Sequence, residues 1–459
     1  MSRTSGLVLM LLLVPAVRVS AAGPASYALN DKSAAGAVFD VSADLQVTGR
    51  AEVKSGAGTA TALPLAVRAG FRYSEKRLAD ARAIDESRSV RYYRTAQAAI
   101  EIDKQKSTPT LRPHVQLMVA QGQRGGPMFF SPGGPLTRDE LDLLKLPGDS
   151  LIVPAILPAN PVALGDKWTP ETEAMQALVG LDVVGQCEVT CTLAEVNDGI
   201  AKVQLSGTVS GGVDGAETQI SLDGHFLFHL EAGYVTRLEL TQKEKRSVGH
   251  VAPGLNVEAR VVVSQQPADN PKELSDEVLS GIPLEPNPAI VQLAYESPDG
   301  KLRFYYDRQW QIFFSDQGLT VLRLLDRGDL VAQCNISRMP AVAPGRHADP
   351  NRFQQDVIKV LGNQFQRLVQ AGEVPGDDGR WIYRLAAVGA AGELPVQWTY
   401  YLVAGPGGDQ AVFVYTMEAK MAERFGTRDL AMVGTVEFPK SSPAPPTRQT
   451  AEKTSAPAQ

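Results

Sequence analysis

Apolar and polar residues alternate along much of the chain up to residue 265, which is the pattern of β-strands that bury one face. Two early runs, 45–53 and 65–73, place mostly apolar residues at every second position. Runs of the same kind follow at 183–194, 200–209, 218–230, 235–245 and 255–264. We therefore predict a β-rich antiparallel domain that spans residues 23–265.

One helix is indicated inside this β pattern, over residues 137–145. Thr137 is a suitable N-cap, and Glu140 three residues later completes a capping box. The Pro-Gly dipeptide at 147–148 marks the end of the helix. The stretch LPANPVALGDKWTP, at 157–170, is rich in turn-forming residues, so we predict turns there rather than a regular element.

Two of the five histidines, His225 and His229, are four residues apart, a spacing that would suit a zinc site on a helix. However, apolar and polar residues alternate from Ile220 to Leu230, which indicates a strand. On a strand the two imidazoles are about 13 Å apart, too far to share an ion whose ligands lie about 2 Å away. We therefore predict no metal site here, and we expect a surface ion pair between His225 and Glu239.

The strand that carries these histidines is predicted to turn back through a three-residue loop, 231–233, with Gly233 in the left-handed conformation. This loop length sets the register of the hairpin and places apolar residues opposite one another on one face. The predicted pairs are Phe228 with Thr236, His229 with Val235, Phe226 with Leu238, and Gly224 with Leu240.

The pattern changes after a proline-rich, acidic stretch at 266–289, which we predict to be a linker with one short helix at 272–279. A second domain is expected over 290–438, and a disordered tail without large apolar residues over 439–459. The strands expected in the second domain lie at about 302–306, 310–315, 319–326, 329–337, 380–388, 395–403 and 410–416, with a helix at about 418–431 and a closing strand at 434–438.

A long helix is predicted between the fourth and fifth of these strands. Asp349 is a suitable N-cap, and Pro350 takes the first helical position. Gly372 is the expected stop. The apolar residues at helical spacing are Phe353, Val357, Leu361, Phe365 and Leu368.

Composition and charge narrow the class of protein. The chain has 459 residues, enough for two or three domains, and its net charge of −6 argues against a nucleic-acid binder.

Arg3 precedes the apolar run 7–14, and small residues offer cleavage near Ala21 or Ala22. We therefore expect a signal peptide over residues 1–22 and a periplasmic or secreted protein. No stretch reaches the ~20 apolar residues of a membrane span.

Residues with chemical reactivity are sparse. The three cysteines, Cys187, Cys191 and Cys334, are no disulfide framework, and the first two would lie about 13 Å apart on a strand, beyond the ~7 Å of a disulfide. Nucleophile-elbow, phosphate-loop, dinucleotide-binding and Cys-x-x-Cys motifs are not found. We therefore predict buried free thiols and no catalytic, cofactor-binding or metal-ligating residue.

Three segments of the second half resemble the PsbP-type α/β/α sandwich. They are SPDGKLRFYYDRQWQIFF at 297–314, DPNRFQQDVIKVLGNQFQRLV at 349–369 and QAVFVYTMEAKMAERFGTRDLAMVGTVEF at 410–438. Their order of strands, helix, strands and helix is that of the family. The resemblance implies an α/β/α sandwich over 290–438 and a non-catalytic role in binding to larger complexes or assisting their assembly.

The first half resembles, over about 35–265, an uncharacterised family of secreted bacterial β-rich proteins. The segments that carry this resemblance are LPANPVALGDKWTP and GHFLFHLEAGYVTRLEL. More distantly it resembles the half-open barrel of the lipoprotein carrier LolA, which implies a curved sheet that can hold an acyl chain, with the 137–145 helix as its cover. The expected fold class is thus α+β: a β-rich antiparallel curved sheet or half-barrel, followed by an α/β/α sandwich.

These observations favour an exported, non-enzymatic binding or assembly protein of the bacterial cell envelope. Its expected partner is an envelope protein or an apolar ligand, without a cofactor. Two alternatives stay open from the residues alone. One is a hydrolase whose site is assembled from scattered Asp, Glu and His residues, and the other is a structural envelope component.

Overall fold

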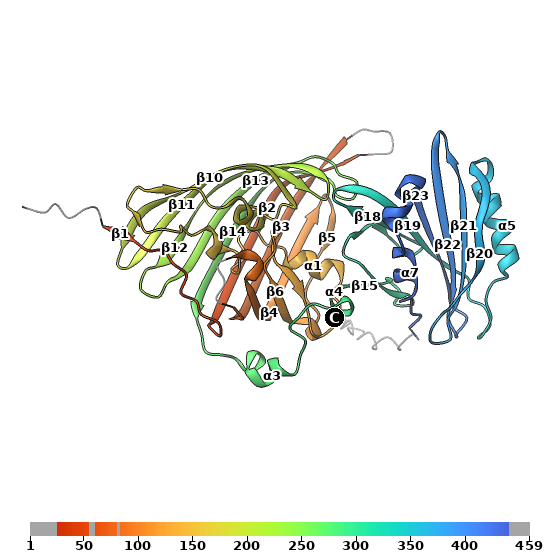
Figure 1. Cartoon of the computed structure of the whole chain (residues 1–459), viewed down its shortest axis with the longest axis horizontal. Coiled ribbons are helices and arrows are strands. Elements are labelled where there is room, and N and C mark those ends of the chain that lie inside the picture. Colours follow the sequence, from red (N-terminus) through yellow and green to blue (C-terminus); the bar gives the residue numbers. More distant parts are fainter. Residues whose placement is uncertain (1–24, 55–59, 80–82, 440–459) are drawn as a thin grey trace, which may run out of the picture.

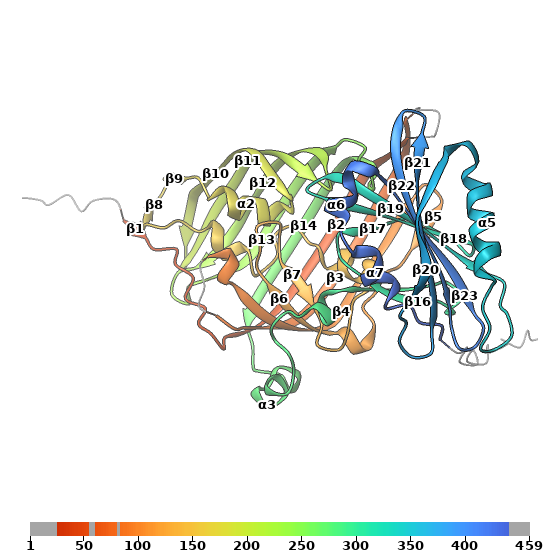
Figure 2. The ribbon, with the colours of Figure 1, turned by 45° about the vertical axis from the view of Figure 1, so that its right-hand side comes forward.

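The structure, a computed structural model, describes residues 25–54, 60–79 and 83–439 (Figure 1). The predicted signal peptide and the predicted tail beyond Pro439 lie outside these residues. Strands make up 53% of the described residues and helices 16%. Most strands belong to two large antiparallel sheets, which lie side by side in Figures 1 and 2.

The first sheet has twelve strands in the order β7-β6-β4-β3-β2-β14-β13-β12-β11-β10-β9, with β5 paired to β4. Its strands are β2 (Val38–Lys54), β3 (Ala60–Arg77), β4 (Arg88–Ile102), β5 (Gln105–Ser107), β6 (Leu117–Gln121), β7 (Met128–Phe130), β9 (Lys167–Trp168), β10 (Val183–Asn197), β11 (Ile200–Val213), β12 (Ala216–His229), β13 (Tyr234–Arg246) and β14 (Gly254–Pro267). A separate pair joins β1 (Ser26–Tyr27) to β8 (Val162–Ala163). The strands predicted in this half are confirmed, although their ends differ by up to seven residues, most of all at the start of β2.

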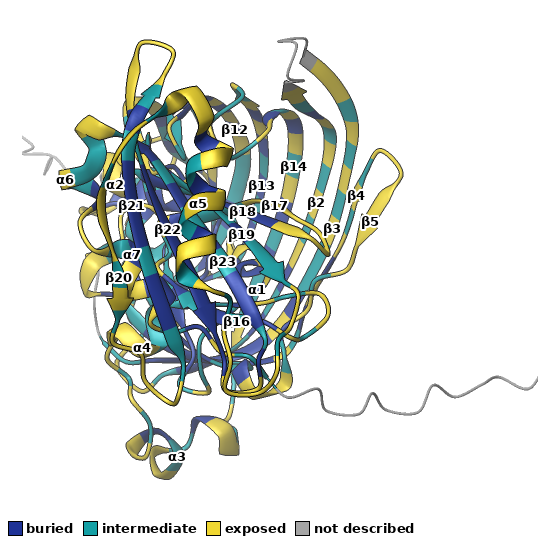
Figure 3. Cartoon of the chain, turned by 90° about the vertical axis from the view of Figure 1, so that its right-hand side faces the viewer, coloured by how far each residue is buried: buried dark blue, intermediate teal, exposed yellow. Residues whose placement is uncertain are grey.

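One face of the first sheet is apolar and packs against α1 (Arg138–Leu144), the 3₁₀ turn η3 (Val153–Ile156) and α2 (Thr172–Val179). Phe226 of the sheet and Met175 of α2 are both fully buried in this core. The other face is polar, and Figure 3 shows the resulting alternation of buried and exposed positions along β2, β3 and β14. Because side chains in a strand alternate between faces, the period-two sequence pattern produces this sheet directly.

The capping box of α1 is confirmed. The Glu140 main-chain N–H donates to the Thr137 side chain at 3.2 Å, and the Thr137 main-chain N–H donates to the Glu140 carboxylate at 2.9 Å. Glu140 also accepts from the Arg112 side chain at 2.7 Å, so the start of α1 is tied to the segment that leads into β6.

The β12–β13 hairpin follows the predicted register along most of its length. Gly233 has φ of +70°, which confirms its left-handed conformation. A bulge after Leu227 shifts the register by one residue, so the predicted partners of Phe228 and His229 are wrong. The observed pairs are Gly224–Leu240, His225–Glu239, Phe226–Leu238, Phe228–Val235 and His229–Tyr234.

The second sheet has seven antiparallel strands in the order β17-β18-β19-β23-β22-β21-β20. Its strands are β17 (Trp310–Ser315), β18 (Leu319–Asp326), β19 (Asp329–Met339), β20 (Phe365–Val374), β21 (Trp381–Ala391), β22 (Leu394–Ala404) and β23 (Gln410–Glu418), and a small pair joins β15 (Leu293–Glu296) to β16 (Arg303–Tyr306). The seven strands predicted at 302–337 and 380–416 are confirmed. The predicted closing strand at 434–438 is wrong, because only a single bridge from Glu437 to Arg303 forms there.

The two helices predicted for the second half are much shorter than expected. Asp349 caps α5 (Pro350–Leu361) as predicted, by accepting from the Arg352 N–H at 2.7 Å. The helix ends at Gly362, whose φ is +52°, and the following residues form β20, which pairs with β21. The helix expected at 418–431 is divided into the turn η6 (Ala419–Met421), α6 (Ala422–Phe425) and α7 (Arg428–Val433).

The α+β class, and with it the α/β/α sandwich over 290–438, is therefore wrong: the chain is mostly β. Residues that the pattern assigned to a long helix form strand β20, and Gly426, with φ of +62°, separates α6 from α7. On the second sheet α5 covers one face, while the helices opposite are too short to form a layer (Figure 1). No helix of the described chain has the length and apolar character needed to cross a membrane.

Two arginines, the buried Arg138 and the half-buried Arg308, join the two sheets. Arg138 of α1 donates to the carbonyl oxygens of Arg308 and Trp310, each at 2.8 Å. In return, Arg308 donates to the carbonyl oxygen of Phe129 in β7 at 2.6 Å. Burial, and then the charge of Arg138, lower the pKa of Arg308 to about 10, so the Arg308 guanidinium group stays charged at neutral pH.

The segment predicted as a linker, 266–289, packs on the first sheet. It contains the turn η4 (Lys272–Leu274) and α3 (Asp276–Ser280) in place of one continuous short helix. Leu274 and Leu279 are buried against β4, β6 and β7. Lys76 of β3 donates to Asp276 at 2.6 Å and holds the segment in place.

Candidate functional site

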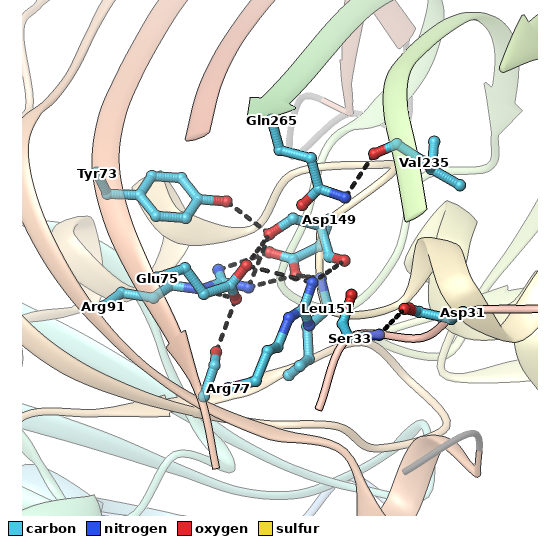
Figure 4. A network of polar contacts seen from close by, with 12 residues as sticks. Asp31, Ser33, Tyr73, Glu75, Arg77, Arg91, Asp149, Leu151, Val235 and Gln265 are labelled. Carbon is cyan, nitrogen blue, oxygen red and sulfur yellow. Dashed lines mark hydrogen bonds and ion pairs between the residues drawn. The ribbon is translucent and has the colours of Figure 1, made fainter. Parts of the chain in front are cut away.

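A group of charged side chains is buried where β3 and β4 pass the turn at 149–150 (Figure 4). Arg91 of β4 donates from Nε to Glu75 of β3 at 2.9 Å, and from its two terminal nitrogens to Asp149 at 2.8 and 2.6 Å. Ser89 and Ser150 donate to the two oxygens of Glu75 at 2.7 and 2.9 Å. We refer to Glu75, Arg91 and Asp149 as the buried charge network.

Arg77 adds a second guanidinium beside this network. Its Nη2 donates to the carbonyl oxygen of Ser150 at 2.9 Å and lies 3.4 Å from Glu75 Oε2. Arg77 is 6% exposed, and the three residues of the network are each 3% exposed or less. Two carboxylates and two guanidinium groups therefore balance in charge, as buried ions must.

The pKa shifts follow from this arrangement. Burial would raise the pKa of Glu75, but the two neighbouring arginines and the two serine hydroxyls outweigh it and lower the pKa to about 2. Burial would lower the pKa of Arg91, but the two carboxylates raise it well above its ordinary value. Burial raises the pKa of nearby Tyr93 to about 12. A general acid or base works best with a pKa near the operating pH. The pKa values of Glu75, Arg91 and Tyr93 lie far from 7, so these groups do not change protonation state near neutral pH. Their role is therefore structural.

A cavity of about 240 Å³ lies between the ends of β3 and β4 and the N-terminal segment 31–34. Arg77 belongs both to its lining and to the surroundings of the buried charge network. Its other charged lining residues are Lys32, Arg88 and Asp31. Asp31 accepts from the N–H of Ser33 at 2.7 Å, as Figure 4 shows. The lining thus carries three cations and one carboxylate.

A second cavity, of about 660 Å³, adjoins the first, since Asp31 and Pro154 line both. Its walls come from η3, the LPANPVALGDKWTP stretch and the start of α2. Trp168 is fixed in this wall because its indole N–H donates to the carbonyl oxygen of Ile156 at 3.0 Å. The charged residues of this lining are Asp31, Asp85, Glu171, Glu173 and Lys167. We refer to the two cavities together as the η3 cleft, and to its parts as the cationic lobe and the acidic lobe.

The histidines singled out in the sequence take structural positions on β12. His225 pairs in register with Glu239, but the Glu239 carboxylate accepts from Arg237 at 2.8 Å instead of forming the expected pair with the imidazole. His229 accepts from the N–H of Ala232 at 3.2 Å and so stabilises the hairpin loop. Among the described residues, no group of three or more His, Cys, Asp or Glu side chains could hold a metal ion.

The three cysteines are free thiols. Cys187 and Cys191 lie on β10, and Cys334 is fully buried on β19. Burial raises the pKa of Cys191 to about 12 and also raises that of Cys334. These two side chains therefore stay protonated and pack as small apolar groups, which is unsuitable for a nucleophile or a metal ligand.

The buried charge network and the cationic lobe were not predicted from the sequence. A signal for the network was present, because Glu75 and Arg77 continue the alternation of Phe71 and Tyr73 and so occupy inward-facing positions. Charged residues at core positions are rare unless they are paired. The partner at Asp149 could not be found this way, because it comes from a turn 74 residues further along the chain than Glu75.

No protein-family model and no curated protein matches the chain. Among solved structures, a crystal structure from Bacteroides thetaiotaomicron VPI-5482 is 13% identical, with 32% of this chain and 48% of that chain covered and a TM-score of 0.25. The match therefore spans about half the length of that protein. Cyanobacterial PsbP (CyanoP) from Synechocystis sp. PCC 6803 is 17% identical, with 32% and 92% covered and a TM-score of 0.25. A PsbP-like region is thus supported only loosely, and these likenesses carry no argument about function.

Proposed function

We propose that the protein is an exported, non-enzymatic binding protein of the bacterial cell envelope, and that it holds its ligand in the η3 cleft. The observation that carries the proposal is the pair of adjoining cavities of about 240 and 660 Å³, with opposite charge in their linings. Binding sites combine a concave surface with a few fixed polar groups, and this cleft has both. The signal-like N-terminus supports export.

Binding is favoured over catalysis by the chemistry beside the cleft. Glu75, the carboxylate nearest to Arg77, is ionised and already accepts hydrogen bonds from Arg91 and two serines. It therefore has no proton to donate and is a weak base. The network instead supplies rigid support for Arg77, which lines the cleft.

The inner face of the first sheet is a less suitable ligand site. The resemblance to LolA would place an acyl chain there, under α1. Leu141 and Leu144 of α1, Ile152 from the following turn and Met175 of α2 are each 5% exposed or less and fill that face. We therefore place the ligand at the edge of this core, in the η3 cleft, where space is present.

The proposal is tested by blocking the acidic lobe. Ala159 is exposed and lines that lobe, so Ala159→Trp fills it without displacing a buried side chain. Mass spectrometry of small molecules released from protein purified natively from its own periplasm is expected to find a bound compound in the wild type and little in the variant.

The matched control is Ala391→Trp, which adds the same side chain at an exposed position at the end of β21, in the second sheet. It should retain as much compound as the wild type. Retention of the same amount by Ala159→Trp, or of nothing by the wild type, would contradict the proposal.

A further inference from the structure

We propose that the cationic lobe of the η3 cleft binds a carboxylate or phosphate group of the ligand, with Arg77 as the principal contact. This inference rests on the proposed binding function and names the chemistry of one end of the ligand. The lobe has a volume of about 240 Å³. Sites that enclose a whole small molecule usually measure about 300–1,000 Å³, so this lobe suits a single functional group.

The lining presents cationic donors to an anion. Lys32, Arg77 and Arg88 line the lobe, and Asp31 is its single carboxylate. Outside the lining, Glu75 lies 3.4 Å from Arg77 and Glu285 pairs with Arg88 at 2.7 Å, so both guanidinium charges are compensated there. The lobe therefore attracts a carboxylate or phosphate through N–H donors on charged groups, in a partly enclosed space where such hydrogen bonds are stronger than in bulk water.

Two donors in this lining lack an acceptor. The Nε–H of Arg77 and that of Arg88 have no hydrogen-bond partner among the described residues, although both nitrogens are buried. Arg77 is only 6% exposed. Buried polar groups nearly always have a partner, and each exception needs an explanation. The lining therefore keeps hydrogen-bonding capacity that the protein itself does not use.

The same two guanidinium groups are held in place from their other sides. Arg77 donates to the carbonyl oxygen of Ser150 at 2.9 Å and lies beside Glu75. Arg88 donates to Glu285 at 2.7 Å and to the carbonyl oxygen of Leu284 at 2.5 Å. Because little rotational freedom is left to lose, an anion binds to donors that are already arranged. The fork of a guanidinium group matches both carboxylate and phosphate oxygens.

The inference is tested by isothermal titration of the full mature protein at low ionic strength with two probes, acetate and inorganic phosphate. Saturable one-to-one binding of at least one probe is expected, and the stronger probe identifies the anion. Added sodium chloride is expected to weaken binding, since it screens the partly exposed lysine.

Three variants and a control locate the site. Arg77→Met is expected to abolish binding, Arg88→Met to weaken it about tenfold, and Lys32→Met, which removes an exposed charge, about threefold. Lys104→Met removes another exposed lysine, from the turn between β4 and β5, and should leave binding unchanged. If Arg77→Met fails to fold, the Arg88 and Lys32 variants carry the test, because neither residue belongs to the buried charge network.

Absence of saturable binding of both probes to the wild type would overturn the inference. Equal binding to the wild type, Lys32→Met and Arg88→Met would also overturn it. Either result leaves the proposed function to its own test, since retention of a compound and its loss in Ala159→Trp depend on the acidic lobe. Failure of that test with anion binding intact would instead contradict the proposed function alone.

Discussion

At the scale of single residues, the charge of Glu75 depends on its neighbours. It is fully buried and ionised, and its charge is compensated by Arg91 on one side and Arg77 on the other. A buried ion pair is weak support for stability as a whole, but removal of one partner leaves the other buried and unpaired. The loss in such cases is typically about 3–5 kcal/mol.

Replacing Glu75 with glutamine is therefore expected to lower the free energy of unfolding at pH 7 by about 3 kcal/mol or more. The wild type should also depend on pH in a defined way. Folding lowers the pKa of Glu75 from 4.5 to about 2, so its stabilising contribution is complete above about pH 4.5 and is lost as the pH falls towards 2. The variant should lack this part of the pH dependence. Urea unfolding at pH 7, 5 and 3 measures both effects.

Glu101→Gln is the matched control, since Glu101 lies on β4 but is exposed and pairs only with Lys106, at 3.5 Å. It should match the wild type within about 0.5 kcal/mol at each pH. Equal stability of Glu75→Gln and the wild type at pH 7 would show that the buried charges are not coupled as described.

Only some of the residues around the buried charge network could be predicted from the sequence. The positions of Glu75 and Arg77 on the inward face follow from alternation alone, but alternation says nothing about which charges meet them. Asp149 and Lys32 come from distant segments. The place of Asp149 beside Arg91, and that of Lys32 in the same lining as Arg77, therefore depend on the packing of η3 and the N-terminal segment against the sheet. The alternation of side chains along a strand shows which face each one occupies, but not which residues of other segments it contacts.

At the scale of elements, local signals determine where the helices α1 and α5 begin, whereas pairing with a distant strand determines where α5 ends. The capping box at Thr137 and the N-cap at Asp349 depend on neighbouring residues only, and both are confirmed. The end of α5 is different. Phe365 and Leu368 fit helical spacing, yet they lie in β20, because Gly362 ends the helix and β21 offers a strand to pair with. Tertiary pairing overrides a short amphipathic pattern in this segment.

Arg138 links α1 to the second sheet, so we expect its replacement to weaken the contact between the two sheets. Arg138→Met keeps the aliphatic stem but leaves the carbonyl oxygens of Arg308 and Trp310 without their donor. We expect a loss of about 2 kcal/mol and, in calorimetry, separate unfolding transitions for the two sheets in place of a single one.

Arg352→Met provides the comparison, because Arg352 lies in the first turn of α5 with a side chain that is 84% exposed. This variant should unfold like the wild type. A single unchanged transition for Arg138→Met would mean that its two hydrogen bonds do not join the sheets.

At the scale of the whole molecule, the two sheets are in direct contact at more than one place. Besides the exchange between Arg138 and Arg308, Gly215 in the β11–β12 turn lies against Gly328 in the β18–β19 turn. A Cβ atom on Gly215 would come within 2.2 Å of the Gly328 carbonyl oxygen, so this approach requires glycine. The segment 266–289 is fixed to the first sheet as well. The η3 cleft is thus part of a body whose halves hold one another in place.

Ligand binding in the η3 cleft is tested most strictly by a crystal structure of the protein purified natively from its own periplasm. We expect electron density for a bound compound in the cleft, with an anionic group within hydrogen-bond distance of the Arg77 guanidinium. A cleft that holds only water in such crystals, with a ligand bound elsewhere or none at all, would show that the η3 cleft is not the ligand site.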